Sequence, residues 1–191
     1  MFSEDVLASI AKIKKRAPLL DFRDKAVFIS NLAFMYQVIV ASERLLKETI
    51  NESSGKLKAY LEAHLDEERE HEKWLSEDLL SAGVDVKTAP LLRTAVEMAG
   101  SQYYLIKHVN PACLLGYMLV LEGFPMPMSM VDELESLYGK GLLRTVRYHA
   151  HHDVNHSKDI MNIMNEYPLQ EVRVNAIQTA IYINEFSEEL R

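Results

Sequence analysis

Apolar residues recur at spacings of three and four along nearly the whole chain, a pattern typical of amphipathic α-helices. Residues that break helices are confined to a few points, such as Pro18, the Ser53-Ser54-Gly55 segment and Pro168. No alternating strand pattern is visible, and no repeat of about 20–50 residues that would indicate a solenoid. The breakers divide the chain into predicted helices at 3–16, 25–51, 56–82, 90–108, 112–122, 129–138, 142–166 and 169–190.

Length and composition favour one ordinary globular domain. With 191 residues and no linker long enough to divide them, we expect a single all-α domain of seven or eight helices over residues 1–191. Hydrophobic residues make up 48% and charged residues 26%, which excludes a disordered chain. The net charge of −7 leaves no basic face to neutralise phosphates, so we expect no nucleic-acid partner.

The same residues indicate where the protein works. The longest apolar run, near 113–121, is about half the length of a membrane span, so we expect no membrane partner. The N-terminus shows no apolar signal region. The single cysteine, Cys113, cannot form an intrachain disulfide. We therefore expect a cytoplasmic protein.

Histidine placement carries the strongest chemical signal. Six of the seven histidines fall in two windows, AHLDEEREHEKW and YHAHHDVNHSKD. Each window contains histidine, carboxylate and histidine at positions i, i+4 and i+7, which share one face of an α-helix. The two triads are His64, Glu68 and His71, then His149, Asp153 and His156.

Both triads lie within apolar stripes that should face the core, such as the one running from Leu61 to Leu75. Six titratable groups in such stripes are costly unless something compensates them. A metal cluster does so, because imidazoles and carboxylates are suitable ligands for iron or manganese.

Two further carboxylates are candidates. Glu122 ends the apolar stretch CLLGYMLVLE, where a lone carboxylate is unusual, and it could bridge two metals. Glu43 could also point inward, but an ordinary surface position explains it better. The acids around Glu68 could equally form a solvated face, and a lone core histidine is more often structural than ligating. His151 and His152 are predicted to lie off the ligand face.

The number of donors favours a dinuclear site, because seven N and O ligands exceed the needs of one tetrahedral zinc. Ferritin-like bundles use Glu-x-x-His pairs around two metals. Glu68 and His71 form such a pair, whereas Asp153 and His156 place aspartate where that pattern has glutamate.

These motifs resemble a known family. The segments HLDEEREHEKWLSEDLLSAG, VLEG and HAHHDVNH look like those of haem-oxygenase-like di-metal oxidases and oxygenases, which share a fold with the TenA thiaminases and the pyrroloquinoline-quinone synthesis oxidase. The resemblance spans about residues 25–185. Its most specific part is the late motif of His149, Asp153 and His156. Glu122 matches the family's bridging glutamate, and His71 matches the histidine that closes the early motif.

The resemblance implies a haem-oxygenase-like fold and two Fe(II) ions that activate O2 to oxidise a small organic substrate. Manganese or a mixed Mn/Fe pair is an alternative. Glu122 would bridge the metals and Asp153 would ligate them, so these two are the expected catalytic residues. Whether His64 or Glu68 is the better ligand stays open, as do the substrate and the need for an electron donor. A homodimer is expected by analogy only.

Other functions are compatible with the same fold. A metal-free enzyme or binding protein for a small heterocycle is the main alternative. A thiaminase-like hydrolase needs a cysteine nucleophile, and Cys113 has no base adjacent in sequence. A haem oxygenase needs a histidine near the N-terminus, whereas the first one here is His64. A metal-storage bundle would bind metal without consuming O2 as an oxidase does.

Overall fold

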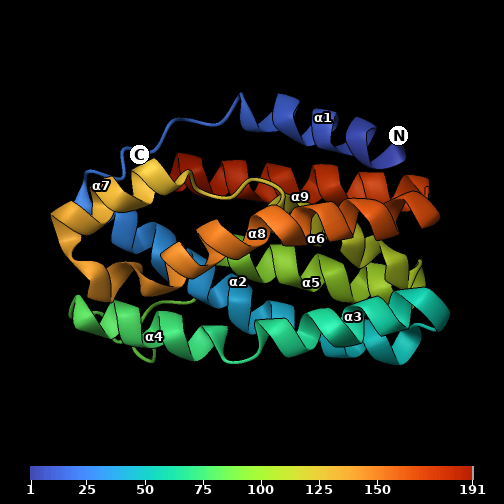
Figure 1. Ribbon diagram of the computed structural model, residues 1–191, viewed down its shortest axis with the longest axis horizontal. Helices are drawn as coiled ribbons and strands as arrows, with labels where there is room; N and C mark the ends of the chain where they lie inside the picture. Colours follow the sequence, from blue (N-terminus) through green and yellow to red (C-terminus); the bar gives the residue numbers. More distant parts are fainter. Residues whose placement is uncertain (191) are drawn as a thin grey trace.

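The computed structural model describes residues 1–190 as a layered bundle of helices (Figure 1). No strand occurs among these residues, and the all-α prediction is confirmed. Every predicted helix except 56–82 matches the observed helices to within three residues. The elements are α1 (Phe2–Lys14), α2 (Lys25–Glu52), α3 (Gly55–Glu68), α4 (His71–Ser81), α5 (Arg93–His108), the 3-10 helix η1 (Pro111–Cys113), α6 (Leu114–Glu122), α7 (Met128–Tyr138), α8 (Lys140–Glu166) and α9 (Gln170–Glu189).

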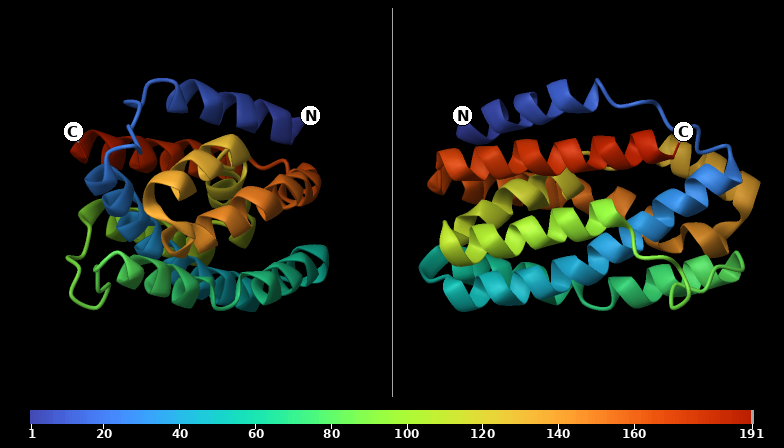
Figure 2. Two further views of the ribbon diagram at one scale, coloured as in Figure 1. Left: turned by 60° about the vertical axis from the view of Figure 1, so that its left-hand side comes forward. Right: turned by 180° about the vertical axis from the view of Figure 1, so that it is seen from behind.

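The short helix α6 lies at the centre of the bundle. Its residues Leu114–Val120 are all buried, and it packs against both α8 and α9. Helix α1 lies along the outer side of α9, while α3 and α4 lie on the opposite side of the molecule, a layering that both views of Figure 2 show. An apolar helix enclosed in this way can bury almost every side chain, which explains its continuous hydrophobic sequence.

Two apolar clusters hold the layers together. The larger surrounds α6 and includes Leu115, Tyr117 and Leu119. The smaller joins α2, α4, α7 and α8 through buried side chains such as Phe28 and Leu79. The polar face of α8 lies between the two clusters, so the apolar cores fix the helices that carry the histidines.

The prediction of one continuous helix over 56–82 is wrong. Helix α3 ends at Glu68 and α4 begins at His71, because Arg69 is extended and Glu70 adopts a left-handed conformation with φ 71°. Glu70 is the only residue other than glycine with a positive φ in the described part of the chain. That conformation costs roughly 1–2 kcal/mol for an L-residue, and the surrounding packing must impose it.

Helix α2 is long and apolar enough to meet the criteria for a membrane span, although it contains no uninterrupted apolar run of that length. Core helices of soluble proteins meet the same criteria. Here α2 packs against α3, α4 and α5.

Candidate metal centre

The structure brings all seven predicted ligands together in the interior, although they come from four helices. Helix α3 carries two, α4 and α6 carry one each, and α8 carries three. We call this set the candidate metal centre: His64, Glu68, His71, Glu122, His149, Asp153 and His156.

Three of the side chains form a first group of potential ligands, with donor atoms within 4.8 Å of one another. His64 Nε2 lies 3.3 Å from Glu122 Oε1, and His156 Nδ1 lies 3.2 Å from Glu122 Oε2. Glu122 is thus placed between two imidazoles from different helices. Each of the three can offer one lone pair to the same point.

A second group, with the same 4.8 Å limit, consists of Glu68, His71 and His149. Glu68 Oε2 lies 3.0 Å from His71 Nδ1 and 3.7 Å from His149 Nε2. The break after α3 places Glu68 at the end of one helix and His71 at the start of the next, so their side chains converge without a shared helix.

Asp153 and Glu68 lie where the two groups meet. His156 Nδ1, a member of the first group, is 3.8 Å from Asp153 Oδ1 and 3.8 Å from Glu68 Oε1. The ion-pair distances of Glu122 within residues 1–190 are to His64 and His156, both of the first group. Glu68 and Asp153 are therefore the carboxylates that lie between the two groups, whereas the family resemblance implied that Glu122 has this bridging position.

Several buried polar atoms of the centre lack a hydrogen-bond partner. They are Glu68 Oε1, His71 Nε2, Glu122 Oε2, Asp153 Oδ1 and His156 Nδ1. Glu122 Oε2 and His156 Nδ1 lie 3.2 Å apart without forming a hydrogen bond. Burying a polar atom without a partner costs roughly 1–3 kcal/mol. Four of these atoms belong to the two ligand groups and the fifth to Asp153 beside them, and all five are nitrogen or oxygen atoms of the kind that bind cations.

The electrostatics of the centre reflect burial and mutual contact. Burial raises the pKa of Asp153 to about 7. Burial alone would lower the pKa of His149, but Glu68 and Asp153 outweigh it and raise that pKa to about 9. Proximity to Glu122 is the main cause that raises the pKa of His156 to about 9. The raised pKa values of His149 and His156 favour protonated imidazoles beside the carboxylates when no metal is bound.

A hydrogen-bond relay on α8 orients His149. Its Nδ1 lies 3.0 Å from the carbonyl oxygen of Thr145, so the N–H at Nδ1 donates there and Nε2 is left to face Glu68. Thr145 is held in turn, because its backbone N–H and its hydroxyl donate to Asp78 Oδ2 at 2.8 and 2.6 Å. Arg144 Nε lies 3.1 Å from Asp78 Oδ1. Outer contacts of this kind fix the tautomer and orientation of ligating histidines.

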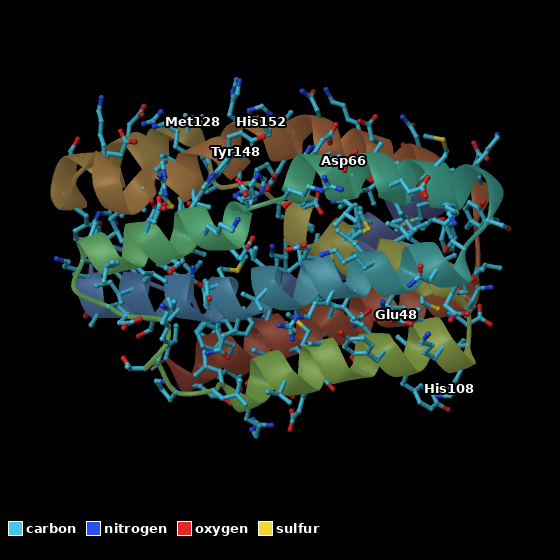
Figure 3. All side chains as sticks on the ribbon, turned by 90° about the horizontal axis from the view of Figure 1, so that it is seen from below. Glu48, Asp66, His108, Met128, Tyr148 and His152 are labelled. Carbon is cyan, nitrogen blue, oxygen red and sulfur yellow. The ribbon has the colours of Figure 1, made fainter. Side chains whose placement is uncertain are left out.

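Sequence reasoning missed Asp78, Thr145 and an aromatic cluster around His71. The ring of His71 lies 4.6 Å from that of Trp74 and 5.0 Å from that of Tyr148. Tyr148 stacks on His152 at 4.1 Å, and Figure 3 shows both side chains on α8. The contact between His71 and Tyr148 joins α4 to α8, so no spacing rule predicts it, although the other two contacts link residues three and four apart on one helix.

The remaining predictions lie outside the two groups. His151 is exposed and His152 stacks on Tyr148, so both lie off the ligand face as expected. Glu43 is ion-paired with Lys47.

A cavity of about 340 Å³ adjoins the centre. His64, Glu68, Glu122, His149 and Asp153 form part of its wall. The rest is largely apolar and comes mainly from α2, α6 and the segment after α6. Its volume falls at the lower end of the range of roughly 300–1,000 Å³ that is usual for small-molecule sites.

Cys113 does not belong to this cavity wall. It is fully buried in η1, and burial raises the pKa of its thiol to about 11. A nucleophilic thiolate acting on a molecule in the cavity is not supported by this position.

Comparisons with known proteins identify the fold. No protein-family model and no curated protein matches the sequence. Among solved structures, a TenA homologue from Pseudomonas syringae pv. tomato superposes with a TM-score of 0.77 at 12% identity, covering 99% of this chain and 92% of that one. A domain of unknown function from Shewanella denitrificans, described as having a haem-oxygenase-like fold, superposes with a TM-score of 0.73 at 15% identity, covering 98% and 86%. The chain has a haem-oxygenase-like fold, and at these identities the likeness shows the fold alone.

Proposed function

We propose that the protein is a non-haem di-metal oxidoreductase, most simply a di-iron oxidase or oxygenase that uses O2 on a small organic substrate. The observation that supports this function is a set of five buried nitrogen and oxygen atoms without hydrogen-bond partners, four of them within the two three-ligand groups and one on Asp153 beside them. Each group combines imidazole with carboxylate and contains no thiolate, which suits Fe(II) or Mn(II).

The residues divide the work between two metal positions. His64, Glu122 and His156 would hold one ion, and Glu68, His71 and His149 would hold the other, with Asp153 between them. When bound, two reduced metal ions supply the electrons that O2 activation requires.

The remaining structure serves binding and exclusion of water. The apolar wall of the cavity holds a substrate beside the ligands and keeps bulk water away from them. Thr145 keeps Nε2 of His149 directed at the centre while Asp78 holds Thr145 in place. Neither residue needs to touch the substrate, so both are positioning residues.

Anaerobic loading with Fe(II), metal counting and subsequent exposure to O2 test this function. We expect two irons per chain and O2 consumption linked to oxidation of the iron. His71→Ala and His156→Ala remove ligands from different groups, so each variant should retain about one iron. His152→Ala, on the same helix as His156 but outside both groups, should retain two. Unchanged iron content in both ligand variants would refute the proposal.

A metal-free function resembling that of the TenA homologue is the second candidate, supported by the similarity of the fold. In that case the cavity binds a small heterocycle, and the seven polar residues are its hydrogen-bonding wall. Two measurements separate the two functions. The metal-free function requires no bound metal, and its heterocycle binding should be unchanged when metal is removed. A storage protein would bind iron but would turn over no organic substrate.

A further inference from the structure

The cavity beside the centre carries an unusual cation. Lys14, from the last turn of α1, is the only lysine or arginine in its wall among the described residues. The other charged side chains that line the cavity are carboxylates or histidines of the centre, together with Glu43 and Glu72. Positive and negative charge are therefore distributed unevenly around an otherwise apolar space.

Lys14 has no anionic partner within residues 1–190. Lysines such as Lys56 and Lys107 form ion pairs with carboxylates, whereas the ammonium group of Lys14 lies 4.0 Å from the centroid of the Phe124 ring. Burial lowers the pKa of Lys14. The Phe124 ring offsets part of the cost of burying this cation, and an anionic ligand would supply the missing counter-charge.

Lys14 and the centre approach the cavity from different layers of the fold. Helix α1 packs on α8 and α9, while α3 and α4 cover the opposite face of the bundle (Figure 1). The ligands Glu68 and His71 belong to that opposite face. A bound molecule can therefore contact Lys14 with one end and the centre with the other.

The volume limits the size of the molecule. About 340 Å³ corresponds to roughly eleven water molecules, at about 30 Å³ each. A ligand of about ten non-hydrogen atoms fills that space, and its body must be apolar to match the wall.

From these observations we propose that the cavity binds an organic monoanion with an apolar body, and that Lys14 binds its anionic group. The inference rests on the proposed function in treating this cavity as the substrate site. Lys14 is the only lysine or arginine in the wall among the described residues, and the rest of the wall is largely apolar, so we assign the anionic group to Lys14. The apolar end is consequently the end presented to the candidate metal centre, and oxidation would occur remote from the charge.

Calorimetric titration of the metal-free full chain tests the proposal with three probes of matched length: octanoate, 1-octanol and octylamine. We expect octanoate to bind at least tenfold more tightly than octylamine, and more tightly than 1-octanol. Lys14→Met should weaken octanoate at least tenfold and change 1-octanol less than threefold. Lys14→Arg should retain octanoate binding within about threefold.

Lys15→Met is the matched control, because Lys15 is the adjacent lysine and lies outside the cavity wall. It should leave all three affinities unchanged. Ile39→Phe places extra volume in the wall and should weaken octanoate and 1-octanol alike, which ties binding to the cavity. Circular dichroism of each variant establishes that it is folded.

The proposal is overturned if octanoate does not bind, if octanoate and 1-octanol bind equally well, or if Lys14→Met binds octanoate like the unchanged protein. Because the titrations contain no metal, their failure is distinguishable from failure of the di-metal function. The iron content of His71→Ala tests the di-metal function and does not change the conclusion drawn from octanoate binding.

Discussion

Helix α6 makes two contrasting contacts with the rest of the bundle. Towards α9 it packs so closely that a Cβ added to Gly116 would lie 2.2 Å from the carbonyl oxygen of Val172. Towards α3 and α8 it ends in Glu122, among imidazoles and unpartnered polar atoms. The first contact is complete without any ligand, whereas the second leaves buried donors unsatisfied. One short helix thus joins a tight contact that stabilises the fold to a cluster of buried polar atoms that do not stabilise it without a ligand.

The largest effect is expected from a substitution at the close contact between α6 and α9. Gly116→Ala should lower the free energy of unfolding by about 3 kcal/mol, because the new methyl group meets backbone atoms that cannot move aside. Helix propensity alone would favour alanine by roughly 1 kcal/mol, so the sign of the change decides which effect dominates. Urea denaturation measures it.

Gly100→Ala is the control for that substitution. Gly100 lies on α5, and a Cβ added to it would have no other atom within 4 Å, so alanine there should be neutral or stabilising by up to about 1 kcal/mol. Equal changes for the two glycines would show that the α6–α9 contact is less tight than described.

A smaller effect is expected on the polar side, through Asp78. Asp78→Ala should lower the free energy of unfolding by about 2 kcal/mol, because the buried N–H of Thr145 loses a charged acceptor. It should also weaken iron binding at least tenfold, since Thr145 orients His149. Chemical denaturation and iron titration measure the two quantities separately.

Glu77→Ala is the matched control, because Glu77 also pairs with Arg144 but is exposed. It should cost less than about 1 kcal/mol and leave iron affinity unchanged. If Asp78→Ala destabilises the fold while iron affinity is retained, the relay to His149 has no role in positioning.

The smallest expected effect concerns the break between α3 and α4. Glu70→Gly should raise the free energy of unfolding by about 1 kcal/mol, because glycine adopts a positive φ without strain. Glu62→Gly, the same substitution within α3, should lower it by about 1 kcal/mol. Thermal unfolding of both variants tests the sign, and destabilisation by Glu70→Gly would contradict the strained conformation.

The sequence predicted most of the fold because helical periodicity is strong and the breakers are few. The late triad could also be located, since α8 is continuous and the spacing of His149, Asp153 and His156 maps directly onto one face. The early triad was located for a reason that is only partly right. His64 and Glu68 share α3, but His71 starts another helix.

What sequence reasoning could not supply depends on contacts between distant segments. The segment around Glu70 contains neither glycine nor proline, so no local signal marks the break. Thr145 and Asp78 meet only because α4 packs on α8. Lys14 reads as an ordinary surface lysine until the cavity wall is known.

The separation of α3 from α4 has a consequence for how this chain can diverge. Inserting or deleting one residue between His149 and His156 would rotate everything beyond it by about 100° and move the three ligands of α8 onto different faces of the helix. Positions 69–70 lie between two separate helices. A change in length there does not rotate α3 or α4 about its own axis, so each helix can keep its orientation. Descendants of this sequence should therefore tolerate indels at that junction while the spacing of the late motif stays constant.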